Sequence, residues 1–259
     1  MIIDIHVHYP FGKTGAFSEN KWDVNDLIAS AKKIDISHIC LLGDVLRYSY
    51  YPTEEQIKET NDFTINAIRQ YPGYFSGFCF LNPDNAPDFI VSEIERCIRV
   101  EKFKGIKLEV SVNCRSPKLD IIMEKAKELN CPVLHHTWYK STAKTDCESE
   151  PSDIVYLAKR HPDVKIIMAH LSGCGFRGVL DIKPFKNVYV DTSGSQPVAG
   201  MLEYAIEKLG ASRILYGSDV PCRDFYCQMG RIMGANISPA DKENILFKNA
   251  AELLNLRSI

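Results

Sequence analysis

The chain has 259 residues, of which 45% are hydrophobic and 25% charged, so it can bury a sizeable core and is not a disordered protein. Its 31 basic and 33 acidic residues leave a net charge of −2, and no lysine- or arginine-rich run stands out. This balance argues against nucleic acid as a partner, because electrostatic binding to phosphates needs clustered positive charge.

The nine cysteines are scattered and form no CxxC pair, so neither a disulfide framework nor a cysteine-rich zinc site is expected. Cys222 and Cys227, which flank a predicted helix start, are interpreted as packing residues. A reducing, cytoplasmic location fits this cysteine usage best. The sequence has no apolar stretch near the ~20 residues of a membrane helix, and it opens directly on a strand, so we expect no signal peptide and no membrane partner.

Short apolar runs alternate with helical patterns along the whole chain. The predicted strands are Ile2–His8, Ser37–Gly43, Tyr74–Leu81, Gly105–Val110, Pro132–His136, Lys165–His170, Asn187–Asp191 and Arg213–Ser218. The predicted helices lie near Asp23–Lys33, Glu54–Gln70, Pro87–Glu101, Pro117–Leu129, Ser152–Arg160, Gly178–Pro184, Val198–Leu209, Phe225–Met233 and Pro239–Leu254. This alternation predicts parallel βαβ units with right-handed crossovers.

At this length, the economical α/β architecture is a single (β/α)8 TIM barrel that forms one domain over residues 1–259. An open doubly wound sheet is the alternative, but it favours a glycine-rich phosphate loop after an early strand, which this sequence lacks. Long connections follow the first, second and fifth strands, at Tyr9–Trp22, Asp44–Thr53 and Thr137–Pro151. In a barrel these loops gather at the carboxyl ends of the strands, where active sites lie.

Two histidines, His6 and His8, stand one residue apart on the first predicted strand. Side chains two residues apart share a face of a strand, so these imidazoles should project together into the barrel with Asp4 below them. The opposite face, toward the helices, would carry Ile3, Ile5 and Val7. A bound metal ion would explain two inward imidazoles, because neutral imidazole nitrogen is a good zinc ligand.

Other polar residues stand at the carboxyl ends of later strands. His135 and His136 end the fifth strand, His170 ends the sixth, and Asp219 ends the eighth. Three or four nitrogen and oxygen ligands with one open position are typical of catalytic zinc sites. Neighbours on a strand face opposite ways, so either His135 or His136, but not both, is expected to point into the site.

These motifs together resemble the amidohydrolase superfamily. The matching segments, in order, are "HVH", "PVLHHT", "IIMAHLSG", "YVDTSG", "RILYGSDVP" and "ILFKNAAELLNL". They are most similar to the amidohydrolase-related branch, which includes metal-dependent hydrolases and the aminocarboxymuconate semialdehyde decarboxylase type. The resemblance implies one divalent metal ion, with zinc expected, held by His6, His8, His136 and Asp219. It also implies that His170 acts as an acid or base, and it selects His136 over His135.

The fourth strand departs from the family pattern. Family members commonly read "GIKLHP" there, whereas this chain reads "GIKLEV". Lys107 and Glu109 share a face of that strand and are candidates for a bridge to a second metal, as in binuclear relatives, or for a simple polar pair. We favour the polar pair and a single metal ion.

The expected reaction is hydrolysis of an amide, lactone or related bond in a small substrate, with carboxylate-bearing molecules among the candidates. A metal ion lowers the pKa of bound water toward ~7, Asp219 would accept the proton, and His170 would orient the water. The alternative is a non-hydrolytic decarboxylase, and a further alternative is a non-catalytic metabolite-binding barrel.

Substrate-binding candidates lie in or near loops at the expected active face. They are Trp138, Arg47, Arg177 and Arg223. An arginine suits a carboxylate because its guanidinium donates two parallel hydrogen bonds, and Trp138 follows the expected ligand His136 closely enough to form a pocket wall. We therefore expect a small molecule as the partner, and the sequence leaves a homo-oligomer open.

Overall fold

The structure, a computed structural model, describes residues 1–11, 23–44, 47–140, 145–196 and 198–256. Its strands are β1 (Ile2–Val7), β2 (Ile36–Leu41), β3 (Phe75–Leu81), β4 (Gly105–Leu108), β5 (Val133–His135), β6 (Ile166–Met168), β7 (Val188–Asp191) and β8 (Ile214–Leu215). Its α-helices are α1 (Val24–Lys32), α2 (Glu54–Gln70), α3 (Pro87–Ile94), α4 (Asp120–Glu128), α5 (Pro151–Arg160), α6 (Leu171–Ile182), α7 (Met201–Leu209), α8 (Phe225–Met233), α9 (Pro239–Glu243) and α10 (Asn249–Leu253).

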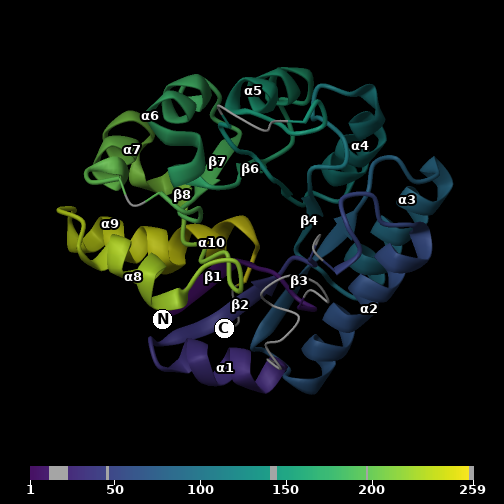
Figure 1. The fold of residues 1–259 in the computed structure, drawn as a ribbon, viewed down its shortest axis with the longest axis horizontal. Helices are drawn as coiled ribbons and strands as arrows, with labels where there is room; N and C mark the ends of the chain where they lie inside the picture. The colour runs from purple at the N-terminus through teal and green to yellow at the C-terminus, as the bar shows by residue number, and fades with distance from the viewer. Residues whose placement is uncertain (12–22, 45–46, 141–144, 197, 257–259) are drawn as a thin grey trace.

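The eight strands form one parallel sheet in chain order, with the helices arranged around it (Figure 1). Backbone hydrogen bonds close the circle between the first and last strands. Ile5 N donates to Tyr216 O (3.0 Å), and His8 N donates to Val220 O (2.8 Å). The predicted (β/α)8 barrel is therefore confirmed.

Several predicted helices differ from the structure. The predicted helix Pro87–Glu101 is divided into α3 and a π-helical segment at Glu95–Val100. The helix after β6 begins at Leu171 rather than Gly178 and is kinked at Gly175, whose φ of 66° is not helical. A glycine takes this conformation without the Cβ clash of other residues, which is why the helical pattern was weak there. The last predicted helix is divided into α9, a π-helical turn at Asn244–Lys248 and α10.

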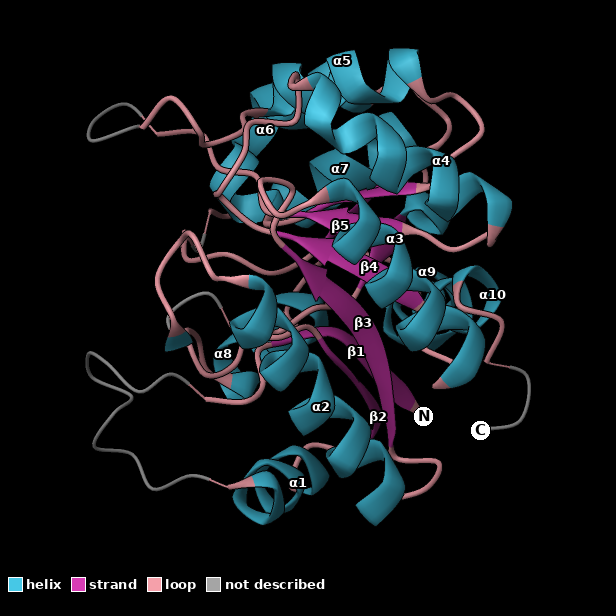
Figure 2. Ribbon diagram, turned by 90° about the vertical axis from the view of Figure 1, so that its right-hand side faces the viewer, coloured by secondary structure: helices cyan, strands magenta, loops and turns pink. Residues whose placement is uncertain are grey.

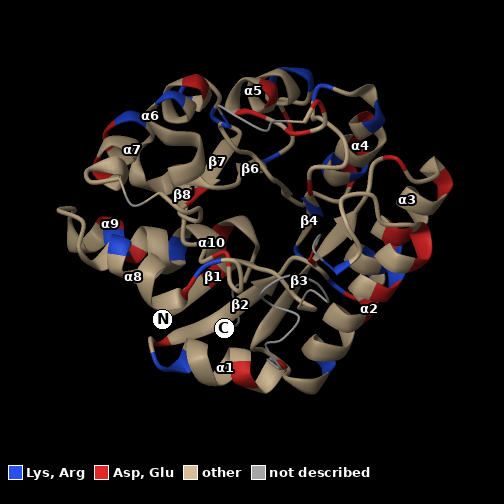
Figure 3. Ribbon diagram, in the orientation of Figure 1, with Lys and Arg blue, Asp and Glu red and all other residues tan. Residues whose placement is uncertain are grey.

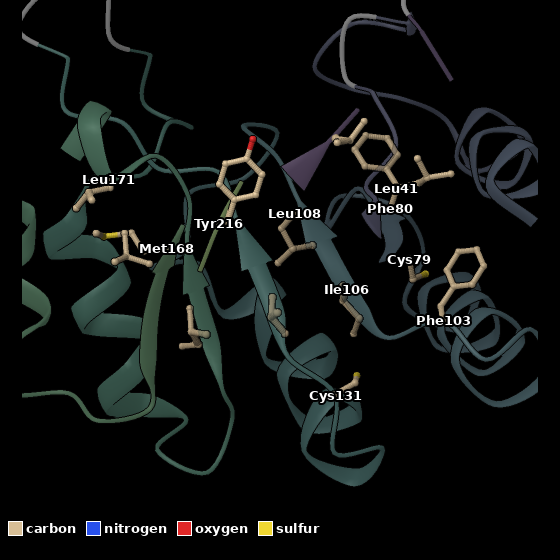
Figure 4. Close-up of a cluster of buried hydrophobic side chains, with 14 of the residues drawn as sticks. Leu41, Cys79, Phe80, Phe103, Ile106, Leu108, Cys131, Met168, Leu171 and Tyr216 are labelled. Carbon is tan, nitrogen blue, oxygen red and sulfur yellow. The ribbon is translucent and has the colours of Figure 1, made fainter. Parts of the chain in front are cut away.

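Apolar side chains pack in two layers. The larger layer lies between the strands and the surrounding helices, and Figure 4 shows part of it around Ile106, Leu108 and Met168. A second cluster combines residues of β1, β2, β3, β5, β6 and β8 with the C-terminal helix α10. Strands on opposite sides of a barrel meet only inside it, so this cluster fills the barrel interior.

The first strand is irregular, and simple alternation was wrong there. The pairing of β1 with β2 shifts register between Asp4 and Val7. As a result, Ile3 and Ile5 pack in the interior cluster, whereas Val7 packs in the layer between strands and helices. A β-bulge of this kind changes which face the following residues occupy, and no residue pattern in the sequence marks it.

The two ends of the barrel differ in what they carry. In Figure 2 the loops that follow the strands gather on one side of the molecule, and both termini lie on the other. Basic and acidic residues are interspersed along the described outer helices (Figure 3). Within the described residues, no helix has both the length and the apolar character that crossing a bilayer requires.

Candidate active site

His6 and His8 lie at the carboxyl end of β1 with their ring nitrogens in defined roles. The Nδ1 atom of His6 donates to Asp191 Oδ2 at 2.7 Å, and the Nδ1 atom of His8 donates to the Gly43 carbonyl at 2.8 Å. In a neutral imidazole the other nitrogen then carries a lone pair. The two Nε2 atoms are only 3.3 Å apart, so two lone pairs converge on one point.

Asp219 completes this cluster from the segment after β8. Its Oδ1 atom lies 3.2 Å from His8 Nε2 and 3.6 Å from His6 Nε2. The backbone of β1 fixes the position of Asp219, because Asp219 N donates to His6 O at 2.8 Å. Asp219 has a φ of 67°, a left-handed conformation that is uncommon for residues other than glycine and is typical of functional sites.

His170 stands directly before α6 and also has a left-handed backbone, with a φ of 70°. Its Nδ1 atom is 2.8 Å from Ser193 Oγ, and the Ser193 hydroxyl donates to Asp191 Oδ1. Because Ser193 uses its proton on Asp191, it accepts from His170 Nδ1. The Nε2 atom of His170 is thus left without a proton in the neutral ring.

Sequence reasoning assigned no role to Asp191 or Ser193. Asp191 binds His6 through one carboxylate oxygen and Ser193 through the other. Asp191 Oδ1 also accepts a hydrogen bond from the backbone N–H of His170 at 3.1 Å. The motif "YVDTSG", which contributed to the family resemblance, contains both residues, but a polar residue at a strand end does not reveal which histidine it contacts.

On the other side of the cluster, His136 follows β5. Its Nδ1 atom lies 3.2 Å from His170 Nε2 and 3.4 Å from Glu109 Oε2. His135 occupies the opposite face, in register with Leu108 and Met168, which belong to the layer between strands and helices. Of the two neighbouring histidines, the structure thus places His136 beside His170.

Lys107 and Glu109 form a buried ion pair, with Lys107 Nζ 2.9 Å from Glu109 Oε1. Neither atom has a well-aligned hydrogen bond within the described residues. Lys107 and Glu109 therefore lie at the distance of the expected polar pair. Glu109 also reaches His136, so the residue that replaces the family histidine contacts the candidate ligand set.

The electrostatics of the cluster favour positive charge at its centre. Burial lowers the pKa of His8, but the hydrogen bond and charge of Asp219 outweigh this and raise it to about 9. Burial raises the pKa of Glu109, but the positive charge of Lys107 outweighs this and brings it to about 2. Burial holds the pKa of His136 near 4 and that of His170 well below its usual range, so both rings are neutral ligands or bases near pH 7.

A cavity of about 480 Å³ opens above these groups. Its described lining residues are His8, Asp44, Tyr50, Glu109, Val110, His136, Trp138, Lys140, Glu148, His170, Asp219, Cys222 and Arg223. Trp138 packs edge-on against His170, with ring centroids 5.2 Å apart. Two of the four predicted substrate-binding residues, Trp138 and Arg223, are therefore in the cavity wall.

The other two predicted substrate-binding residues lie outside that wall. Arg47 donates to Phe11 O at 3.2 Å and stacks on Phe63, so its guanidinium is used to hold the loop after β2. Arg177 is exposed on α6, where it stacks on Tyr139. Part of the predicted loop over residues 9–22 and residues 141–144 of the loop after β5 lie outside the described residues.

Comparison with known proteins identifies the family. The family model described as amidohydrolase matches residues 3–256. The chain belongs to the amidohydrolase family. This match bears out the resemblance of the sequence motifs, and it makes the protein an enzyme of the amidohydrolase superfamily.

Solved structures of similar fold include three decarboxylases. A 2,6-dihydroxybenzoate decarboxylase in complex with 2,6-dihydroxybenzoate is 18% identical, with a TM-score of 0.81 and 98% of each chain covered. A 5-carboxyvanillate decarboxylase from Sphingomonas paucimobilis is 16% identical, with a TM-score of 0.80 and 98% of each chain covered. A dihydroxybenzoic acid decarboxylase from a Polaromonas species, with bound manganese and 2-nitroresorcinol, is 19% identical, with a TM-score of 0.79 over 100% of this chain and 98% of that one. At these identities the likeness concerns the fold.

The residues of this amidohydrolase fit a divalent cation. His6 Nε2 and His8 Nε2 lie 3.3 Å apart beside Asp219, and the raised pKa of His8 shows that this point favours positive charge, which a divalent cation would supply in place of the His8 proton. A His6 nitrogen, a His170 nitrogen and an Asp219 oxygen all lie within 4.8 Å of one another. The hydrogen bonds from Nδ1 to Asp191 and Gly43 are the outer contacts that orient ligand histidines in metal sites.

Proposed function

We propose that this amidohydrolase is a metal-dependent decarboxylase of a small aromatic carboxylic acid. From the sequence, hydrolysis is the expected reaction and decarboxylation is the alternative. Decarboxylase activity in the names of three proteins with the same fold supports the reverse order. In this proposal His6, His8, His136 and Asp219 hold one divalent ion, and Asp219 and His170 carry the chemistry. The close donor group of the structure contains His170 in place of His136, and His136 reaches it through His170 Nε2 at 3.2 Å.

The observation that carries the proposal is the composition of the cavity wall. Trp138 presents a flat aromatic surface beside His170, and Arg223 and Asp219 line the same cavity of about 480 Å³. A planar ring with a carboxylate matches these groups, because an aromatic wall packs on a ring and a guanidinium binds a carboxylate by two parallel hydrogen bonds. The volume lies within the range of small-molecule sites.

The bound metal would supply positive charge that holds the oxygen atoms of the substrate in place. Arg223 would bind the carboxylate, and Trp138 would keep the ring plane fixed while excluding water. A proton from the Asp219 carboxyl group is transferred to the ring carbon that bears the carboxylate. The carbon–carbon bond then breaks, its electron pair returns to the ring, and carbon dioxide leaves.

His170 would act beside Asp219 rather than as the proton donor to carbon. Its Nδ1 atom is committed to Ser193, and it lies 3.9 Å from Asp219 Oδ2. This distance exceeds that of a hydrogen bond, so the neutral His170 ring would pack beside the Asp219 carboxyl group, and its Nε2 atom, which carries no proton, would serve as a nearby base. The overall reaction consumes one proton and one carboxylate and gives one carbon dioxide and the unsubstituted ring carbon.

Incubation with hydroxybenzoic acids in deuterated water tests the proposal. Decarboxylation places one deuterium on the ring carbon that lost its carboxylate, which NMR detects, and it releases an equal amount of carbon dioxide. Cleavage of lactones or amides without release of carbon dioxide from any aryl acid would instead support the hydrolase. The metal-loaded protein should be used, and a chelated sample should lose activity.

A pair of arginine variants shows which residue binds the carboxylate. Arg223→Gln removes a guanidinium from the cavity wall, and we expect KM for the acid to rise by about tenfold to a hundredfold. Arg177→Gln is the matched control, because Arg177 is exposed and stacks on Tyr139 outside the wall. Equal KM values for the two variants would remove Arg223 from the substrate site.

A further inference from the structure

Cys222 lies closer to the candidate metal centre than its place in the sequence indicated. A His8 ring nitrogen, an Asp219 carboxylate oxygen and the Cys222 sulfur all lie within 4.8 Å of one another. Cys222 is half-buried, and it lines the same cavity as His8 and Asp219. The packing role expected from the sequence does not account for a thiol at this position.

The backbone holds this thiol in place through contacts with β1. His8 N donates to Val220 O at 2.8 Å, and Arg223 N donates to Asp219 O at 2.9 Å. The resulting tight turn over residues 219–223 brings Cys222 back over His8. Among the described residues, the Cys222 sulfur has no hydrogen-bond partner. No such bond therefore holds the sulfur away from His8 and Asp219.

We propose that Cys222 is an additional ligand of the metal ion and makes this centre favour zinc over manganese. Thiolate is a soft ligand that suits zinc, whereas manganese suits carboxylate, carbonyl and water oxygens. Ligation replaces the thiol proton with the metal and releases that proton to solvent. Asp219 belongs to both donor groups, and His8 Nε2 lies 3.3 Å from His6 Nε2 of the other group, so one ion beside Asp219 is close to the sulfur as well.

This inference rests on the proposed metal centre but not on the proposed reaction. The alternative is that Cys222 only shapes the wall of the substrate cavity, in which case the metal would have nitrogen and oxygen ligands alone. The two arrangements differ in metal preference and in spectrum. Both properties are measured without turnover, so failure of the decarboxylase assay leaves them unaffected.

Cobalt spectroscopy distinguishes the two arrangements. The metal-free full chain is loaded with Co²⁺ alone, and a thiolate ligand gives an intense sulfur-to-cobalt charge-transfer absorption in the near ultraviolet. We expect this absorption in the wild-type protein and its loss in Cys222→Ser. Cys227→Ser is the matched control, because Cys227 is exposed on α8. Retention of the absorption in Cys222→Ser, or its absence in the wild type, overturns the proposal.

Competition between metals gives a second readout. Equilibration of the protein with Zn²⁺ and Mn²⁺, followed by metal analysis, gives the preference for zinc as a ratio. Cys222→Ser should lower that ratio by at least about tenfold, mainly through weaker zinc binding. An unchanged ratio means that the sulfur is not a ligand. A protein that binds neither ion overturns both this inference and the metal centre.

Alkylation of the wild-type protein avoids any effect of substitution on folding. Zn²⁺ should slow the reaction of Cys222 with iodoacetamide by tenfold or more, because a metal-bound thiolate is less available to the reagent. Cys227 should react at the same rate with and without zinc, and peptide mass spectrometry separates the two sites. Equal rates for Cys222 in both samples contradict ligation.

Discussion

The two ends of the barrel use the same strands for opposite purposes. At the carboxyl end, His6 of β1 and His8, which follows the strand, bring their Nε2 atoms to 3.3 Å from each other. At the amino end, β1 carries Ile3 and Ile5, which pack with α10 in the interior cluster. Polar groups buried at close range cost stability unless a ligand satisfies them, whereas apolar contacts stabilise the fold without any ligand.

This comparison teaches that stability and chemistry are separated along the barrel axis. His170 and Asp219 keep uncommon backbone conformations at the carboxyl end, which is tolerated because the rest of the barrel determines their positions. At the amino end, His38 has a partner for each ring nitrogen, Gly73 O and Ser76 Oγ. Substitutions at the two ends should therefore change different measurements.

The largest effect is expected from His8→Ala at the carboxyl end. The variant removes one of the two converging nitrogens, so we expect loss of bound metal and a fall in kcat/KM of more than about a thousandfold. Metal content and turnover are measured on the same sample. His161→Ala is the control, because His161 contacts Asp120 at the end of α5, away from the cluster. Full activity of metal-depleted His8→Ala protein would contradict the metal centre.

Phe78→Ala tests the amino end. Phe78 is fully buried in the interior cluster, and removal of an aromatic ring from a core costs about 3–5 kcal/mol in the free energy of unfolding. We expect the activity of the folded variant to stay within about threefold of wild type. Phe176→Ala, on the exposed surface of α6, removes only an edge-on pair with Tyr204 and should cost about 0.5–1.5 kcal/mol. Loss of metal together with stability would show that the two ends are not separate.

The sequence predicts the barrel and the convergence of the site well, for identifiable reasons. Strong alternation of apolar runs and helical patterns marks the strands, and a parallel barrel brings their carboxyl ends together. The sequence alone therefore predicts that His6, His8, His170 and Asp219 lie near one another. Their proposed roles as ligands and acid–base groups came from the family resemblance.

Other features of the site depend on geometry that residue patterns do not encode. The register shift in β1 changes which side chains face the interior, and it has no signature residue. The contact between Ser193 and His170 joins two residues that are 23 positions apart, one after β7 and one after β6. Cys222 lies beside the candidate metal ligands His8 and Asp219 only because the backbone turns back at residues 219–223. Each of these features depends on contacts between residues that are far apart in the sequence.

Ser193→Ala sharpens the comparison within the carboxyl end. Ser193 is a positioning residue, because it connects His170 Nδ1 to Asp191. Without the hydroxyl, His170 loses the partner that fixes its tautomer, and we expect kcat to fall by about tenfold to a hundredfold with little change in KM. The pH profile of kcat should shift as well, which loss of packing alone would not cause. Ser195→Ala, whose hydroxyl contacts Gln196 instead, should behave as wild type.

The smallest expected effect concerns His38 at the amino end. Burial lowers the pKa of His38 below its usual value of 6.5, so the folded protein binds this proton less well than the unfolded chain does. The contribution of His38 to stability is therefore complete above pH 6.5 and is lost as the pH falls below it. His38→Gln retains hydrogen-bonding groups but does not titrate. In urea unfolding at pH 7.5, 6.5 and 5.5, wild type should lose more stability than the variant, by less than about 1 kcal/mol. Equal losses of unfolding free energy in wild type and His38→Gln would show that protonation of His38 does not affect stability. The two ends of the barrel would then differ in the geometry of their histidines but not in the effect of pH on the amino end.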